Sequence, residues 1–565
     1  MQRRLVLVLT IFGWALLLAS PAMAIEGSVG NLGIHPFPPN HGPVYVTPAP
    51  PVAAPIPDMK VNDDAGSAGQ LEPYIAAWGD TLYVGFKDWR SGLKRIWSAV
   101  STNSGATWGT NIIVPESTQY TASSDIWISV DHRGYAYYYT LPYSASVMNA
   151  ELTWTTDGGN SFRLPVVIVS RNGQTTNDKN ACDVVGDTVY ADYDYSNIGQ
   201  FAKSTNQGVS FGAPVNFGSA YDVIGAIPQA QGNLVYIMYL STSTYYNMLV
   251  KSTNGGTSFG SATTAQAAST NFYYNLPRYH DLPTPSGYVW YIACTDFLID
   301  RSNGYLYAVY TDDSASSGWA DALFSRSTNG GTSWSTPVPV HDPTYLGDGT
   351  CQYEPMIAQD PVNGVLFCGW YDTRLSAVQG DTSTTQDFYA TYSSDRGLTW
   401  KHPDTRLTAV SSKIAVVNEG SGRNRFGEYE GAAASKNRGF FVWEDGRNGN
   451  ADIYFNILQG PSGMETGGGT QKEFAFKLSQ NVPNPVDSGT LISYELPKAM
   501  SVELCLYNTL GRKVRTLVQG NQAAGSHQVS WDGKDQTGRP VPSGVYLYQL
   551  NAGSLQAVKQ LVVMK

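Results

Sequence analysis

The sequence predicts an all-β protein built from radially arranged repeats, followed by a small second β domain. Three observations predict this fold class. A short turn motif recurs six times. Between its copies, short aromatic and β-branched runs alternate with turns rich in Gly, Asn, Asp and Ser, which is typical of strands. After a Gly-rich stretch at 459–471 the motif stops and a different strand pattern begins.

The recurring motif reads Ser/Thr-x-Asp/Asn-x-Gly-x-Ser/Thr-aromatic. Its copies are 101–108, 155–162, 204–211, 252–259, 327–334 and 393–400. The Asp or Asn side chain is expected to accept hydrogen bonds from nearby backbone N–H groups. The fifth residue is glycine in every copy, which predicts a positive φ there. The closing Trp or Phe is expected to insert into a core. The motif therefore predicts a structural turn and by itself names no reaction.

The strand pattern between these turns predicts the number of repeats. A second-strand pattern recurs at 81–88, 305–312, 365–372 and 439–445. Seven candidate first strands lie at 72–78, 125–131, 180–186, 221–227, 296–302, 354–360 and 428–434. Because the seventh unit ends at 451–458 without a turn motif, we predict that the N-terminal segment completes it. A seven-bladed β-propeller is favoured, and six blades are the alternative.

Composition divides the chain into five parts. Residues 1–24 have the arginines, apolar run and Ala-x-Ala end of a secretory signal, with a membrane anchor as the alternative. Residues 25–60 are Pro-rich, 61–458 form the expected propeller, 459–471 a linker and 472–565 the second domain. We therefore expect a secreted or surface-displayed protein, with no transmembrane span after cleavage of the signal.

The net charge and the spacing of the histidines and cysteines limit which partners, metals and disulfides the chain is expected to have. The formal net charge is −10 and no basic run is present, which argues against a nucleic-acid partner. The seven histidines are not clustered, so no zinc or copper site and no cofactor is predicted. The five cysteines are scattered and odd in number, and Cys351 with Cys368 is the pairing least at odds with the spacing.

The turn motif resembles the Asp box of the sialidase (BNR-repeat) superfamily, and the resemblance covers roughly 61–458. It implies a propeller of four-stranded antiparallel blades, with each box between the third and fourth strands. It also implies an extracellular glycan as ligand or substrate.

The C-terminal part resembles the sorting domain of type IX secretion substrates, which is akin to the FlgD-type Ig-like module. The matching stretches are 477–485, 490–497, 502–517, 525–550 and 559–565. Read as strands, they predict a small β-sandwich. The resemblance implies export by the type IX machinery, followed by release or surface attachment. A plain Ig-like adhesive module is the alternative.

Acidic and basic residues are expected to gather at one end of the propeller channel. The first strands open with Glu72, Asp125, Asp222, Asp296, Glu354 and Glu428. Second strands end in Asp-x-Arg three times, at 88–90, 372–374 and 445–447. Because first strands begin where second strands end, these residues predict a polar pocket to which Glu72 and Glu354 contribute substrate contacts. A channel cap or a structural Ca²⁺ is the alternative role of the acids.

The resemblance to sialidases implies roles for several of these residues. Arg90, Arg374 and Arg447 would clamp the carboxylate of an acidic sugar, since a guanidinium pairs two-to-two with a carboxylate. Asp88 would be the acid, and Tyr429, assisted by Glu428, the nucleophile. The chain departs from the family on its first blade, where 71–75 reads Leu-Glu-Pro-Tyr-Ile and lacks the family's arginine.

Two functions are therefore kept open. One is an exo-α-sialidase-type glycoside hydrolase, and the other is a non-catalytic surface propeller that binds glycans or proteins. The repetition of Asp-x-Arg in three blades also fits a structural role, because a repeated feature is what a fold requires whereas a site should break the symmetry.

Overall fold

The computed structural model describes residues 44–45, 57–66, 68–172, 177–244, 246–266, 295–312, 319–379, 384–413, 430–462, 476–481, 483–486, 489–496, 500–522, 525–553 and 555–564. These residues form β-strands and one short 3-10 helix, η3 (Pro343–Tyr345). The predicted signal, most of the Pro-rich segment and most of the linker lie outside them. The part of the chain that the structure describes includes no helix of the length and apolarity needed to cross a membrane.

The described residues between 59 and 459 form seven antiparallel sheets of similar design, six of four strands and one of five. The first three sheets are β3 (Gln70–Trp78), β4 (Thr81–Asp88), β5 (Arg95–Ser101) and β6 (Ile112–Ile113); β7 (Ala122–Val130), β8 (Ala136–Tyr143), β9 (Val147–Thr155) and β10 (Val166–Asn172); and β11 (Asn177–Val185), β12 (Thr188–Tyr195), β13 (Ile198–Ser204) and β14 (Val215–Phe217).

Two further sheets of four strands follow along the chain. They are β15 (Val223–Gln231), β16 (Leu234–Ser241), β17 (Asn247–Ser252) and β18 (Thr263–Gln266); and β19 (Asp296–Asp300), β20 (Tyr305–Asp312), β21 (Asp321–Ser327) and β22 (Val338–Pro339).

The five-stranded sheet and the last sheet complete the set. They are β23 (Gln352–Gln359), β24 (Leu366–Asp372), β26 (Thr385–Ser393), β27 (Thr405–Arg406) and β28 (Ser412–Lys413); and β29 (Gly431–Ser435), β30 (Arg438–Asp445), β31 (Asp452–Gln459) and β2 (Met59–Lys60). A separate two-stranded ladder joins β1 (Val44–Tyr45) to β25 (Val378–Gln379).

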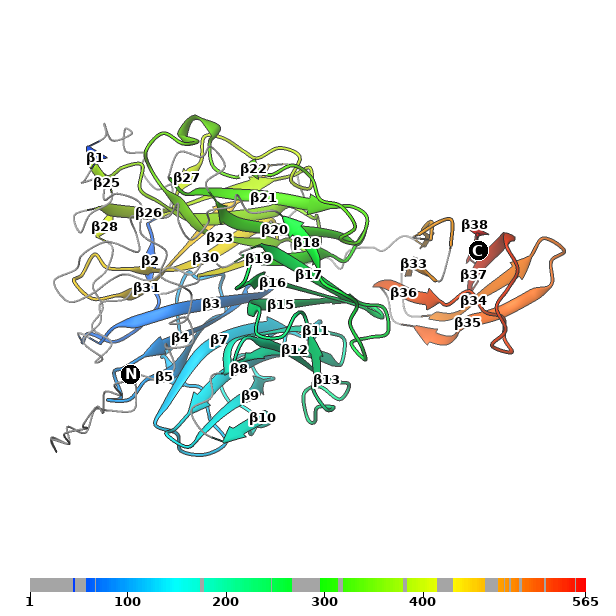
Figure 1. Cartoon of the computed structure of the whole chain (residues 1–565), viewed down its shortest axis with the longest axis horizontal. Coiled ribbons are helices and arrows are strands. Elements are labelled where there is room, and N and C mark those ends of the chain that lie inside the picture. Colours follow the sequence, from blue (N-terminus) through cyan, green and yellow to red (C-terminus); the bar gives the residue numbers. More distant parts are fainter. Residues whose placement is uncertain are drawn as a thin grey trace, which may run out of the picture.

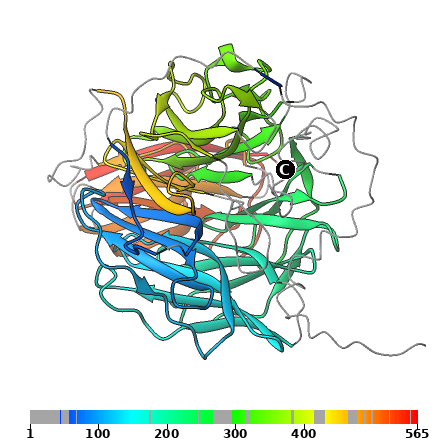
Figure 2. The same cartoon turned by 90° about the vertical axis from the view of Figure 1, so that its left-hand side faces the viewer.

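The sheets close into a ring. The first strand of each sheet contacts the first strand of the next, and β29 of the last sheet contacts β3 of the first. Figure 2 shows the sheets following one another around a centre in chain order, with yellow β29–β31 next to the blue first sheet. The N-terminal strand β2 pairs with β31, which is the pairing predicted for the last repeat. Because 267–294 and 414–429 lie outside the described residues, the blade number stays a prediction.

The Asp-box turns have the predicted geometry. The boxed glycines all have positive φ, between 76° and 87°: Gly105, Gly159, Gly208, Gly256, Gly331 and Gly397. In the fifth box, Asn329 Oδ1 accepts the N–H of Ser333 at 3.0 Å, and Ser327 Oγ accepts the N–H of Gly331 at 2.9 Å. The closing aromatics of three boxes pack against a ring of the preceding sheet, as Trp400 does edge-on against Phe324 at 5.2 Å. Phe162 packs against Tyr138 of its own sheet.

The C-terminal residues form a separate two-sheet sandwich (Figure 1). One sheet contains β32 (Lys477–Leu478), β33 (Thr490–Leu496) and β36 (Gly525–Trp531), and the other β35 (Lys513–Gln522), β34 (Met500–Asn508), β37 (Gly544–Ala552) and β38 (Leu555–Val563). A core that includes Trp531 and Tyr548 lies between the sheets, so this part buries its own apolar side chains as predicted. Cys351 and Cys368 are buried free thiols, so the pairing considered from the sequence does not form.

Candidate ligand-binding pocket

The first strands share an irregularity near the end at which they begin. Pairing with the second strand shifts register there in five sheets, as in β3 between Leu71 and Tyr74. The residues with positive φ at these bulges are Glu72, Asp125, Lys179, Gly225 and Glu354. Four of the five are charged non-glycine residues, for which the left-handed conformation is unfavourable, and such strain persists where surrounding structure enforces it.

Just inside the level of these bulges, each sheet contributes one residue to a layer around the centre of the ring. Each of its members pairs with the residue three positions before the end of the second strand, as Tyr74 pairs with Gly85. The layer consists of Tyr74, Ile126, Ala181, Ile227, Asp296, Met356 and Gly431. Six of the sheets thus place an uncharged residue at this position, and one places a carboxyl group. Asp296 is the member that breaks the symmetry of the ring.

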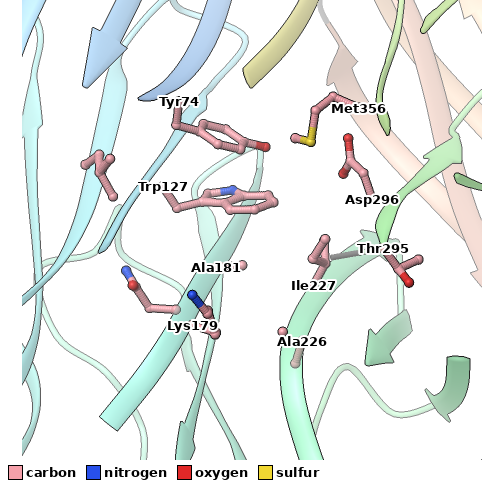
Figure 3. A pocket seen from close by; sticks show the side chains of 12 residues that line it. Tyr74, Trp127, Lys179, Ala181, Ala226, Ile227, Thr295, Asp296 and Met356 are labelled. Atoms are coloured by element: carbon pink, nitrogen blue, oxygen red, sulfur yellow. The ribbon is translucent and has the colours of Figure 1, made fainter. Parts of the chain in front are cut away.

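A pocket opens at this layer, and we call it the central pocket. Its lining residues are Tyr74, Ile126, Trp127, Lys179, Asn180, Ala181, Gly225, Ala226, Ile227, Thr295, Asp296 and Met356. Figure 3 shows the Tyr74 and Trp127 rings lying over one another on one side, and Asp296 with Met356 on the other. The two rings stack with centroids 4.1 Å apart. An aromatic wall with a few polar groups is typical of small-ligand sites.

Asp296 is 7% exposed and is held by two backbone donors. Its Oδ2 accepts the N–H of Ile357 from the neighbouring sheet at 2.8 Å, and its Oδ1 accepts the N–H of Phe297 at 2.8 Å. Burial outweighs these bonds and raises the pKa of Asp296 to about 7. Burial and the nearby Asp296 charge raise the pKa of Tyr74 well above its usual value. Near neutral pH the pocket therefore holds one carboxyl group that can either donate or accept a proton.

A charged network surrounds the pocket at the level of the bulges. The Lys87 ammonium bridges the Glu72 and Asp125 carboxylates, at 2.8 Å to Asp125. Asp125 Oδ2 in turn accepts the N–H of Lys179 at 3.2 Å, and the N–H of Glu72 donates to the Glu444 side chain from the last sheet. These bonds connect neighbouring sheets and hold the strained bulges in place.

A second acidic group lies beside this network but does not line the pocket. Tyr371 OH lies 2.5 Å from Glu430 Oε1, and both residues are buried. Burial and the nearby Glu444 and Glu354 charges raise the pKa of Glu430 well above its usual value. Burial and Glu430 do the same to the pKa of Tyr371. A tyrosine that stays protonated is a hydrogen-bond donor here and a poor nucleophile.

The three predicted clamp arginines are each paired near their own sheet. The Arg90 Nε donates to Asp88 at 2.7 Å and its guanidinium also pairs with Asp63. In each case the guanidinium lies over a ring of its own sheet: Arg90 over Trp97 at 4.5 Å, Arg374 over Tyr389 at 4.3 Å and Arg447 over Tyr454 at 4.1 Å.

Arg374 and Arg447 use their remaining donors in the same way. The Arg374 Nη2 bonds Asp372 at 2.5 Å and Asp404 at 2.8 Å. The Arg447 Nη2 bonds Asp445 and Asp58, both at 2.6 Å. The repeated geometry favours the structural role that the sequence left open.

The structure does not bring the other predicted site residues together in one pocket. Asp88 is fully buried under Arg90, and burial raises its pKa. Glu72 and Glu354 are buried at the bulges, where the N–H of Glu354 donates to Thr311 Oγ1 at 3.0 Å. Asp222 bonds Ser241 Oγ at 2.8 Å at the start of β15 and does not line the pocket. Tyr429 and Glu428 lie outside the described residues.

Sequence reasoning missed the aromatic wall and Lys179 as pocket residues. A signal was present, because Tyr74 follows Glu72 and Trp127 follows Asp125 by two residues along strands already assigned. It could not be used without knowing where the bulges fall, since one inserted residue reverses which side chains face the centre. As for metals, the described His, Cys, Asp and Glu residues form no group of three or more able to hold an ion.

Comparison with known proteins finds a family model that matches the C-terminal part of the chain, but none is found that matches the chain as a whole. The FlgD Ig-like domain model matches residues 473–556. Among curated proteins, none matches the sequence.

Similar solved structures include a protein of unknown function from Dyadobacter fermentans, with 12% identity and a TM-score of 0.39, covering 72% of this chain and 98% of that one. A Hadza microbial sialidase shows 12% identity and a TM-score of 0.36, covering 69% and 66%. An α-L-arabinofuranosidase from Fusarium graminearum shows 9% identity and a TM-score of 0.38, covering 72% and 98%. At these values the likeness carries no argument about substrate or reaction.

Proposed function

We propose that the ring is a seven-bladed Asp-box propeller that binds an extracellular glycan in its central pocket. The observation that carries this proposal is the break in symmetry at Asp296. Six sheets place an uncharged residue at that register position, so the fold does not require a carboxyl group there. A buried carboxyl group at a position where the other six sheets have none is a candidate for ligand recognition.

The rest of the pocket suits a sugar. The Tyr74–Trp127 stack offers an apolar surface for the C–H face of a pyranose or furanose ring. Asp296, Thr295 and Asn180 provide hydrogen-bonding groups for hydroxyls along the same lining. The Lys179 side chain adds a positive charge at the pocket wall.

The geometry favours binding over sialidase-type hydrolysis. Sialidases use a tyrosine nucleophile beside their acid, and the buried Tyr371–Glu430 pair does not line the pocket that holds Asp296. The arginines that would clamp an acidic sugar are occupied by acids of their own surroundings. The non-catalytic function is therefore the first candidate.

A glycan array probed with the full chain tests this function. We expect binding to at least one glycan, with Asp296→Asn weakening it tenfold or more, about the effect of losing a hydrogen bond to a charged group. The matched control is Asp222→Asn, which removes an acid at the start of another first strand outside the pocket. Binding that is equal in wild type and Asp296→Asn, or absent on all glycans, would overturn the proposal.

Hydrolysis of exo-α-sialidase type is the second candidate, and the pKa of Asp296 favours it. A carboxyl group with a pKa of about 7 can act as a general acid near neutral pH. If it does, release of fluorophore from fluorogenic glycosides, sialosides included, will fall as pH rises above about 7 and will be lost in Asp296→Asn. No release from any substrate by a chain that still binds glycans would leave binding as the function.

We also propose that residues 1–24 are removed on export and that 472–565 direct the chain to the outer surface through the type IX machinery. The FlgD Ig-like match supports a discrete module there. In a host with this machinery, deletion of 472–565 should retain the chain in the periplasm. Unchanged surface delivery of the truncated chain would contradict the proposed role.

A further inference from the structure

The loop that follows β4 and the last residue of β8 bring a small group of side chains to the end of the ring where the first strands begin. We call this group the mouth rim: Trp89, Leu93, Lys94 and Tyr143. The Lys94 ammonium lies between two rings, 6.0 Å from the Trp89 centroid and 5.3 Å from that of Tyr143. Leu93 is 47% exposed, and the other three side chains are partly exposed.

Trp89 is a second break in the symmetry of the ring. It is the middle residue of an Asp-x-Arg motif that recurs at the same strand end in three sheets. The corresponding residues are Thr373 and Gly446. In all three copies the Asp accepts the N–H of the Arg at 2.7 to 2.9 Å, whatever the middle residue is. The motif therefore does not require an indole at this position.

The mouth rim is connected to the wall of the central pocket by a short series of hydrogen bonds. The Lys94 ammonium donates to Ser124 Oγ at 3.5 Å, and this hydroxyl donates to Asp125 Oδ1 at 2.9 Å. Asp125 Oδ2 accepts the N–H of Lys179, which lines the pocket. The rim and this wall of the pocket therefore lie at the same end of the ring.

We propose that the mouth rim is an outer subsite for a second sugar, so that the ligand is an oligosaccharide rather than a single sugar. Indole and phenol rings pack against the C–H faces of sugars, and an ammonium group donates to their hydroxyls. The central pocket holds the terminal residue, and the rim contacts the next one. This inference rests on the proposed function, because it names the substrate class of the same site.

A chain-length series tests the outer subsite. Isothermal titration of the full chain with cello-, chito-, xylo- and arabino-oligosaccharides of one to four units compares successive lengths of one sugar. We expect the disaccharide to bind about 3- to 10-fold more tightly than the monosaccharide, the size of one aromatic contact. Trp89→Ala should remove this gain and leave the monosaccharide affinity unchanged, whereas Asp296→Asn should weaken every length.

Two further variants guard against a folding defect. Tyr143→Ala removes the other ring of the rim and should give the same loss of length dependence, while Trp89→Phe, which keeps a ring, should retain most of it. Equal affinity for mono- and disaccharide, or a Trp89→Ala effect that is the same at every length, would overturn the subsite but not the pocket. Absence of binding to all sugars would overturn the proposed function and the subsite together.

Discussion

At the scale of one residue, Asp296 shows how a residue proposed to bind a ligand can be distinguished from residues that build the ring. It is buried, accepts two backbone N–H groups and stands where the other sheets place uncharged residues. The clamp arginines show the opposite case, because the same pairing recurs in three sheets. We therefore propose Asp296, which breaks the symmetry of the ring, as the site residue, and not the arginines, which repeat it.

The first residue-scale prediction concerns pH. The pKa of Asp296 is raised from 3.8 to about 7. Between these values the folded state holds a proton that the unfolded state has lost, so stability falls as pH rises through this window and levels off above it. At about 1.4 kcal/mol per pKa unit, the loss amounts to a few kcal/mol.

Urea unfolding between pH 4 and pH 8 measures this effect. Asp296→Asn should show a smaller loss of stability over that range than wild type, because it carries no titrating group. Thr295→Ser, a change to a neighbouring lining residue that does not titrate, should keep the wild-type slope. If the free energy of unfolding depends on pH in the same way for wild type and Asp296→Asn, the raised pKa of Asp296 is wrong.

The second residue-scale prediction concerns the Asp boxes. Gly331 has a φ of +85°, and an added Cβ would overlap Leu249. Gly158 of the second box has a φ of +72° with nothing within 4 Å of an added Cβ. Gly331→Val should therefore destabilise the chain more than Gly158→Val, whose cost is the backbone strain of about 1–2 kcal/mol. Thermal unfolding compares the two, and equal melting temperatures would mean that crowding at Gly331 is unimportant.

The box turns could be predicted residue by residue because their bonds are local. Asn329, Gly331 and Ser333 lie within five residues of one another, and the sequence contains all the groups that hold the turn. Asp296 was named as a first-strand acid, but its depth could not be predicted. That depth depends on pairing with β20, which is a non-local property.

At the scale of elements, the ring-closing strand β2 is held by the arginines expected to bind substrate. Arg447 bonds Asp58 just before β2, and Arg90 pairs with Asp63 just after it. Asn62 donates to Asp452 at 2.9 Å between these two points. The Asp-x-Arg motif thus fastens the N-terminal strand to the last and first sheets, which explains its position without a ligand.

Removing one of these arginines should weaken ring closure. Arg447→Ala leaves the buried Asp58 and Asp445 carboxylates without their partner, and breaking a buried pair costs about 3–5 kcal/mol. Urea unfolding measures the loss. The control Lys513→Ala breaks an exposed pair with Glu503 in the C-terminal sandwich and should leave stability unchanged. A loss below 1 kcal/mol for Arg447→Ala, roughly that of a surface pair, would contradict this role.

Strand prediction was most successful where the pattern repeats. The second strands expected at 81–88 and 305–312 match β4 and β20 at both ends. Four first strands begin two or three residues earlier than expected, as β7 does at Ala122, because residues before the acid also pair across the bulge. The strand β15 begins two residues later than expected, at Val223.

At the scale of the whole molecule, the ring and the C-terminal sandwich have separate cores. The ring brings residues from distant parts of the sequence to one pocket, from Tyr74 to Met356. The sequence pattern predicted the ring and the C-terminal sandwich. The repeats also predicted that acidic and basic side chains would gather at one end of the ring. Which of these side chains line the pocket followed only from the register of the assembled sheets.

A crystal structure of the full chain with a bound oligosaccharide tests the central claim most directly. We predict one sugar in contact with Tyr74, Trp127 and Asp296, and a second beside Trp89. A sugar held instead by Arg90, Arg374 or Arg447, or one bound on the Asp-box turns with the central pocket empty, would contradict the account.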